Sequence, residues 1–157
     1  MDKSFYKSPI GILEITCKNN ALVSLKLCSS AEGVSYDTDL IKTVKIQLDE
    51  YFSGKRKTFD LRINPAGTDF QKIIWDELKK IPYGKTKNYS DIAELSGKKG
   101  AQRAVGSACN KNPILIIIPC HRVIAKNGSI GGFAYGNSIK NMLLNLEKAN
   151  ISEKKKY

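Results

Sequence analysis

The chain has 157 residues, with 26 Lys and Arg against 15 Asp and Glu, which gives a formal net charge of +11. This length is enough for one compact domain or two small ones without disulfide or metal cross-links. The longest wholly apolar run, 114–119, is far too short to span a membrane, and no signal peptide opens the chain, so we expect a cytoplasmic protein with no membrane partner.

A small sheet and one helix are predicted near the amino terminus. Strand-like segments at 10–16 and 21–27 are joined by a tight turn, which predicts an antiparallel pair. Apolar residues at helical spacing predict a helix over 38–53. The segment 58–63 is a candidate third strand.

The Pro-Ala-Gly segment at 65–67 predicts a boundary between an amino-terminal α/β domain, 1–66, and a second domain, 67–157. The second domain opens with Thr68 and Gln71, spaced as a capping box, which predicts the start of a helix. The fold class is therefore α/β (α+β): a small antiparallel sheet with a helix, then a mostly helical domain.

Two short helices follow, at 90–96 with Ser90 as N-cap and at 101–110. A glycine-containing turn joins them, which is typical of a helix-turn-helix. The second helix carries one long cation, Arg103, among small residues: Ala104, Gly106, Ser107 and Ala108. Such a face predicts either tight packing against another helix or insertion into a DNA groove.

Positive charge is concentrated in the second domain. No acidic residue lies between Glu94 and Glu147, whereas Lys and Arg recur throughout that segment. A stretch of this kind attracts polyanions such as DNA. A lysine-rich proteome would explain a general excess of cations, but it explains poorly why one segment excludes acids.

The only histidine of the chain, His121, lies between Cys120 and Arg122, after an apolar run predicted to be a buried strand. A neighbouring base or cation lowers the pKa of a thiol and so favours the reactive thiolate. Cys120 is therefore either a nucleophile or an inert core residue, since cysteine is often buried. Successive strand residues point to opposite faces, so Cys120 and His121 cooperate only if Pro119 turns the chain or a water bridges them.

A final helix is predicted over 138–149, with Glu147 bordering its apolar face. That carboxylate either orients His121 or is an ordinary exposed glutamate. The tail 153–157 is predicted to be mobile. With one histidine and no C-x-x-C spacing, we expect free thiols and no metal site.

The segment Ile118–Val123 resembles the active-site motif of the O6-alkylguanine-DNA alkyltransferases. The resemblance runs from about Thr68 to Glu147, whereas the first 66 residues resemble the family's amino-terminal domain only in outline. Further matching positions are Pro82-Tyr83-Gly84, Tyr89-Ser90, Arg103-Ala104-Val105-Gly106, Asn112-Pro113, Lys140 and Leu143-Leu144.

The resemblance implies a DNA repair protein with a winged-helix-like second domain. It would move the alkyl group from O6-methylguanine in double-stranded DNA irreversibly to Cys120, once per molecule, as a monomer and without a cofactor. His121 would act as base through a water, and Glu147 would orient the imidazole. Tyr89 would assist charge development on the leaving guanine and help the nucleotide rotate out of the duplex.

The resemblance also implies the remaining contacts. Arg103 would fill the space left by the rotated nucleotide. Asn112 would hold the hinge between the active site and the helix that recognises DNA, which the segment 103–106 resembles. Further DNA contacts are implied for Ala104, Gly106, Ser107 and Arg122. The backbone at Cys120 and Val123 would bind the guanine, in a pocket completed by Cys109, Phe133, Ala134 and Tyr135.

Two positions depart from the family pattern. Tyr135 stands where the family usually has glycine, in a loop that borders the alkyl pocket, so we expect methyl groups to be accepted and benzyl groups to be disfavoured. Phe133 replaces the commoner tyrosine and lacks its hydroxyl.

Two other functions remain open on the sequence. A cysteine hydrolase would need a base from elsewhere in the chain, yet the only histidine is adjacent to the thiol. A non-catalytic DNA-binding module would not need the cysteine in the motif.

Overall fold

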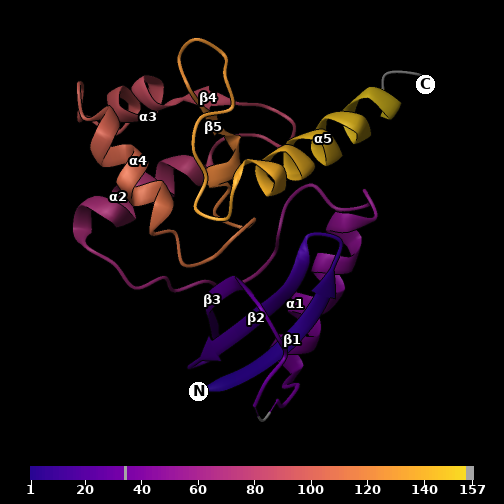
Figure 1. The fold of residues 1–157 in the computed structure, drawn as a ribbon. Helices are drawn as coiled ribbons and strands as arrows, with labels where there is room; N and C mark the ends of the chain where they lie inside the picture. The colour runs from indigo at the N-terminus through magenta and orange to yellow at the C-terminus, as the bar shows by residue number, and fades with distance from the viewer. Residues whose placement is uncertain (34, 155–157) are drawn as a thin grey trace. The chain divides into compact units, whose positions relative to one another are not determined.

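The computed structural model describes residues 1–33 and 35–154. The chain forms two compact units (Figure 1). One comprises Met1–Ala66 and Pro113–Leu115, and the other comprises Gly67–Asn112 and the chain from Ile116 onward. Each unit is described by itself below.

The first unit is a three-stranded antiparallel sheet, in the order β1 (Asp2–Ser8), β2 (Gly11–Lys18) and β3 (Ala21–Cys28), with helix α1 (Asp39–Phe52) in contact with it (Figure 1). Thr38 caps helix α1, and its hydroxyl accepts a hydrogen bond from the main-chain N–H of Ile41. Apolar side chains of strands and helix form the core: Leu13, Ile15, Leu22, Leu25, Ile41, Val44, Leu48 and Tyr51.

The prediction of a third strand at 58–63 is wrong: that segment forms no strand, and the third strand of the sheet is β1. In 58–63, Ile63 forms an isolated bridge to Leu22. The Gln47 side chain binds the main chain of Asp60 through both its amide nitrogen, at 3.0 Å, and its amide oxygen, at 2.9 Å. These bonds take up main-chain groups that a strand would pair with a neighbour.

The apolar run at 114–119 is buried, but it is not the predicted strand. Ile114 forms one parallel bridge to Leu25, and the chain then turns through Ile116, which has a φ of 73°. The side-chain amide of Asn112 donates to the carbonyl of Ile118 at 2.7 Å, so this oxygen is paired without a strand neighbour. The spacing of apolar residues cannot distinguish a buried strand from another buried segment in so short a run.

The second unit is mostly helical. Its elements in chain order are α2 (Asp69–Lys79), β4 (Lys87–Asn88), α3 (Tyr89–Leu95), α4 (Gln102–Asn110), the 3₁₀ helix η1 (Cys120–Arg122), β5 (Val123–Ile124) and α5 (Asn137–Lys154). Strands β4 and β5 pair in parallel, and α2, α3 and α4 contact one another. Trp75 of α2 is buried and donates from its indole to the carbonyl of Ala108 at 2.9 Å. The predicted α/β architecture is confirmed.

The ends of the helices follow mostly local signals. The capping box of Thr68 and Gln71 is confirmed. For α3 the predicted N-cap, Ser90, is wrong: Asn88 caps the helix and forms a capping box with Asp91. Tyr89 is therefore the first residue of α3, next to β4.

Helix α5 continues to Lys154, beyond the predicted end at 149. Residues 155–157 of the predicted mobile tail lie outside the described residues. Among residues 1–33 and 35–154, no helix is both long and apolar enough to cross a membrane.

Candidate active site

The sequence Cys120-His121-Arg122 forms η1, and all three side chains are buried. Pro119 turns the chain out of strand geometry, with φ −83° and ψ 64°. This meets the condition that the sequence set for cooperation between Cys120 and His121, since adjacent side chains of a 3₁₀ helix do not point to opposite faces as in a strand.

Glu147 of α5 is fully buried and lies beside His121, with 2.6 Å between its Oε2 and the Nε2 of the imidazole. The Arg122 guanidinium donates to both carboxylate oxygens, at 2.8 and 3.1 Å, and the main-chain N–H of Gly84 donates to Oε1 at 3.1 Å. Burial acts to raise the pKa of Glu147, but the hydrogen bonds from His121 and Arg122 and the charge of Arg122 hold it below its usual range. The carboxylate is therefore ionised, and the alternative of an exposed glutamate is wrong.

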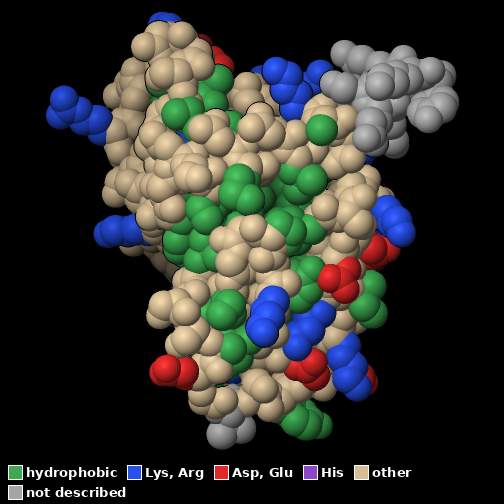
Figure 2. Space-filling model, turned by 45° about the vertical axis from the view of Figure 1, so that its right-hand side comes forward, with side chains coloured by type: hydrophobic (Ala, Val, Ile, Leu, Met, Phe, Trp, Pro, Cys, Tyr) green, Lys and Arg blue, Asp and Glu red, His purple; other side chains and the backbone are tan. Residues whose placement is uncertain are grey.

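His121 is neutral in this setting, because burial lowers its pKa even though Glu147 acts to raise it. An ionised carboxylate only accepts hydrogen bonds, so Nε2 carries the hydrogen and Nδ1 carries a lone pair. Nδ1 is buried and has no hydrogen-bond partner among the described residues. No histidine is visible on the face drawn in Figure 2, in agreement with the 0% exposure of this side chain.

Arg122 does not fit the predicted DNA contact. Besides its bonds to Glu147, it donates to the carbonyl of Ile81 at 2.8 Å and lies 5.7 Å from the centre of the Tyr83 ring. The side chain is buried, so its guanidinium is not available to a phosphate.

Cys120 is 5% exposed, and its sulfur accepts a hydrogen bond from the side-chain amide of Asn112 at 3.2 Å. Burial raises the pKa of this thiol, whereas the Asn112 hydrogen bond and the charge of Lys140 act to lower it. The groups that favour the thiolate are thus Asn112 and Lys140, and not the sequence neighbours His121 and Arg122.

Lys140 was absent from the predicted site, although it is fully buried there. It donates to the carbonyl oxygens of Val123, at 2.5 Å, and Gly132, at 3.1 Å. A signal was present: Lys140, Leu143 and Glu147 follow helical spacing, so they share one face of α5.

Tyr89 lies beside α4 and the loop 128–136, which contains four glycines. Its hydroxyl donates to the carbonyl of Gly132 at 3.4 Å, and burial raises the pKa of the phenol to about 12. Tyr89 and Arg103 line a cavity of about 330 Å³ together with Gln102, Gly106, Asn110 and Gly132. Ala104 and Ser107 are exposed on α4.

The remaining predicted pocket residues lie on two elements. Cys109 is buried on α4, and burial raises the pKa of its thiol. Phe133 and Tyr135 are half-buried, and their rings meet edge to face with centres 6.0 Å apart. Ala134, between them, is exposed.

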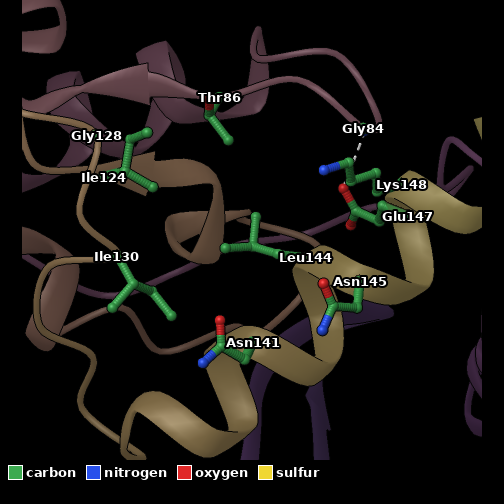
Figure 3. Close-up of a pocket in the computed structure, with 10 residues that line it drawn as sticks. All are labelled: Gly84, Thr86, Ile124, Gly128, Ile130, Asn141, Leu144, Asn145, Glu147 and Lys148. Carbon is green, nitrogen blue, oxygen red and sulfur yellow. Dashed lines mark hydrogen bonds between the residues drawn. The ribbon is translucent and has the colours of Figure 1, made fainter.

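A second cavity of about 510 Å³ borders Glu147 (Figure 3). Helix α5 supplies Asn141, Leu144, Asn145 and Lys148, and the facing segments supply Gly84, Thr86, Ile124, Gly128 and Ile130. In Figure 3 the dashed line joins Gly84 to the Glu147 carboxylate, at the edge of this cavity.

Within the described part of the chain, no group of three His, Cys, Asp or Glu side chains could hold a metal ion. The four cysteines, Cys17, Cys28, Cys109 and Cys120, are free thiols.

Models of one protein family match both units of the chain. Residues 69–149 match the family model of the 6-O-methylguanine DNA methyltransferase DNA binding domain, and residues 1–65 match that of its ribonuclease-like domain. A methylated-DNA--protein-cysteine methyltransferase of Methanosarcina barkeri is 45% identical over 151 residues, covering 92% of this chain and 96% of that protein.

Two solved structures are also similar. The chain aligns with Mycobacterium tuberculosis OGT in complex with DNA with a TM-score of 0.88 and 38% identity, over 96% of this chain and 94% of the other. It aligns with an O6-methylguanine DNA methyltransferase from Methanococcus jannaschii with a TM-score of 0.69 and 32% identity, over 92% of each chain.

Proposed function

Because the chain belongs to the 6-O-methylguanine DNA methyltransferase family, we propose that it repairs DNA by transferring the alkyl group of O6-methylguanine to Cys120. The observation that carries this proposal is the arrangement of thiol, imidazole and carboxylate. Asn112 binds the sulfur, while the ionised Glu147 fixes the hydrogen of His121 on Nε2 and leaves Nδ1 as a base.

In the transfer, the sulfur of Cys120 attacks the alkyl carbon, and the bond between that carbon and guanine O6 breaks. The electron pair of the broken bond goes to the guanine, and the thiol proton passes through a water to Nδ1 of His121 and from there to the guanine. The product is a thioether, which water does not hydrolyse under mild conditions. Each molecule therefore completes one transfer.

The DNA partner is double-stranded DNA that contains alkylated guanine. A relative with 38% identity has been solved in complex with DNA, which supports binding of DNA by this chain. An alkyl group on O6 cannot be reached inside a duplex, so the nucleotide must rotate out, at a cost of a few kcal/mol. Arg103 would occupy the gap, and its position at the cavity that Tyr89 also lines supports this role.

The small residues of α4 allow the helix to approach DNA closely, which suits binding in the minor groove. Ala104 and Ser107 are exposed on α4, and Gly106 lines the same cavity as Tyr89. The cytoplasmic location and the monomeric state stay predictions.

Mass spectrometry after incubation with a duplex containing O6-methylguanine tests the function. We expect one methyl group on the peptide with Cys120, none in the Cys120→Ala variant, and none with undamaged DNA. Unmodified wild-type protein that still binds the duplex would instead support a non-catalytic DNA-binding module. Repeated turnover of an ester would support a cysteine hydrolase.

The Tyr135→Gly variant tests the size of the alkyl pocket. We expect the wild-type chain to accept methyl faster than benzyl, because Tyr135 and its neighbour Phe133 carry bulky rings in the loop. Removal of the Tyr135 ring is expected to speed benzyl transfer by about 10-fold or more, as for other steric limits in a pocket. Single-turnover rates with both substrates measure this, and the methyl rate of the same variant is the control. Equal wild-type rates for methyl and benzyl would contradict it.

A further inference from the structure

The segment between α2 and β4 contacts the buried ion pair of Arg122 and Glu147 through three of its residues. The carbonyl of Ile81 accepts a hydrogen bond from Arg122 at 2.8 Å. The N–H of Gly84 donates to Glu147 at 3.1 Å. Between these two contacts, Tyr83 places its ring against Arg122, with 5.7 Å from the ring centre to the guanidinium carbon. The transfer chemistry described above gives this ring no role.

The Tyr83 ring is held from a second side by α5. It is 7% exposed, and its hydroxyl accepts a hydrogen bond from the side-chain amide of Asn150 at 3.0 Å. The same amide group donates to the carbonyl of Leu146, one turn earlier, at 3.0 Å. Asn150 lies three residues after Glu147, so both side chains lie on one face of α5. The ring is therefore fixed between Arg122 of η1 and Asn150 of α5.

The Tyr83 ring limits where the Arg122 guanidinium can lie. All three nitrogens of this group donate hydrogen bonds: Nε and Nη2 to Glu147, at 2.8 and 3.1 Å, and Nη1 to the carbonyl of Ile81. The face of an aromatic ring attracts a cation within about 6 Å, most strongly where water is excluded. The guanidinium therefore cannot slide along the carboxylate without leaving the face of the ring.

The position of the guanidinium in turn sets the direction of the Glu147 carboxylate. Oε1 accepts from Nε of Arg122 and from Gly84, whereas Oε2 accepts from Nη2 of Arg122 and lies 2.6 Å from Nε2 of His121. Two parallel bonds to a guanidinium fix the plane of a carboxylate as well as its place. Oε2 therefore stays directed at the imidazole as long as Arg122 keeps both bonds.

We propose that Tyr83 is a positioning residue of the transfer site, whose ring holds the Arg122 guanidinium on both oxygens of Glu147 and so keeps the hydrogen of His121 on Nε2. This inference rests on the proposed function, in which the lone pair on Nδ1 is the base. Tyr83 acts through Arg122 and Glu147 and not on the DNA.

The first experiment reads the His121 tautomer without DNA. His121 is the only histidine, so nuclear magnetic resonance of protein labelled with ¹⁵N-histidine reports one imidazole. At neutral pH the wild-type protein is expected to show a neutral ring with its hydrogen on Nε2. In Tyr83→Leu we expect the two nitrogen shifts to move towards each other, as in an imidazole that exchanges between tautomers. Tyr83→Phe keeps the ring and should retain the wild-type spectrum.

The matched control is Tyr51→Leu, which makes the same substitution at a fully buried tyrosine of the first unit. It removes a ring of the same size from a core that does not include His121, so the imidazole spectrum should not change.

The second experiment measures single-turnover methyl transfer at saturating DNA. Tyr83→Leu is expected to be slower than wild type by about 10-fold or more, because the general base is no longer held in one tautomer. Tyr83→Phe should stay close to wild type. DNA affinity should change little in both variants, because the ring is buried.

A shape-conserving substitution serves if Tyr83→Leu does not fold. Pentafluorophenylalanine at position 83 keeps a ring of similar size, but its fluorine atoms withdraw the negative charge from the ring face that attracts a cation. With Tyr83→Phe as reference, it is expected to show the tautomer exchange and the slower transfer.

A single Nε2–H tautomer in folded Tyr83→Leu, or in the pentafluorophenylalanine protein, would overturn the proposal at any transfer rate, because the ring would then only fill space. If the wild-type protein transfers no methyl group, the proposed function fails, while the imidazole spectra still decide the role of Tyr83.

Discussion

The Glu147→Gln variant is expected to lose about 3–5 kcal/mol of folding free energy, as is typical when one partner of a buried ion pair is removed. Glu147 accepts from His121, from Gly84 and twice from Arg122, and its side chain is fully buried. Glutamine has one carbonyl oxygen, so its NH₂ group must face an N–H donor. The Arg122 charge would then be buried without its counter-charge.

The same substitution is expected to slow methyl transfer by about 100-fold or more, the usual contribution of a positioned general base. Without an anionic acceptor at Nε2, the imidazole is no longer held in the tautomer that leaves Nδ1 as a base. Urea unfolding followed by the fluorescence of Trp75, the only tryptophan, measures stability in the unit that contains Glu147, and mass spectrometry of Cys120 measures transfer.

The control for this variant is Asp76→Asn on α2. Asp76 forms a solvent-exposed ion pair with Lys79 at 3.1 Å, and such pairs contribute about 0–1 kcal/mol. Similar stability losses in the two variants would contradict the role of Glu147 as the buried counter-charge of Arg122. So would full transfer activity in Glu147→Gln.

The sequence could predict features that depend on neighbouring residues. Thr68 and Gln71 form the predicted capping box, and the helix pair at α3 and α4 follows its glycine-containing turn. The closeness of Glu147 to His121 was one of two alternatives, because spacing on α5 gives the face of a residue but not what that face contacts. A motif of consecutive residues, Cys120-His121-Arg122, is what predicted the place of the candidate site.

The sequence could not predict features that depend on distant partners. Arg122 was expected to contact DNA, but its direction is set by Glu147 and Ile81, which are remote in the chain. The sequence did not predict the role of Gly84. Its φ of 75° favours glycine, and its N–H donates to Glu147, which is remote in the chain.

Strand β1 was missed for a related reason. The segment Asp2–Ser8 is largely polar and has one buried side chain, Ser4, so it shows no apolar alternation. Asp2–Ser8 forms a strand because it pairs with β2 along its whole length. The sequence of the segment itself does not show this pairing, because it depends on the neighbouring strand.

The stability of the second unit is expected to fall between pH 6.5 and pH 5, by up to about 1.4 kcal/mol per pH unit. His121 is fully buried, and burial lowers its pKa in the folded state. In the unfolded chain the imidazole titrates near pH 6.5, so within this range the unfolded state binds more protons than the folded state. The free energy of unfolding therefore rises with pH and falls with acid.

Glu147 extends the same trend to lower pH. Its pKa in the folded state is below the usual range, so its contribution is complete above the pKa of an unfolded glutamate and is lost as pH falls towards the folded value. Both buried groups of the His121–Glu147 pair thus favour unfolding in acid, His121 first and Glu147 afterwards.

The His121→Gln variant separates the two contributions, because the chain has no other histidine. Urea unfolding followed by Trp75 fluorescence at several pH values between 5 and 7.5 should give a steep slope for wild type and a nearly flat line for the variant. Equal slopes would show that His121 titrates alike in both states, which is incompatible with an imidazole buried in its neutral form. In that case Nδ1 would be partly protonated near neutral pH, and the base required for the attack by Cys120 would be absent.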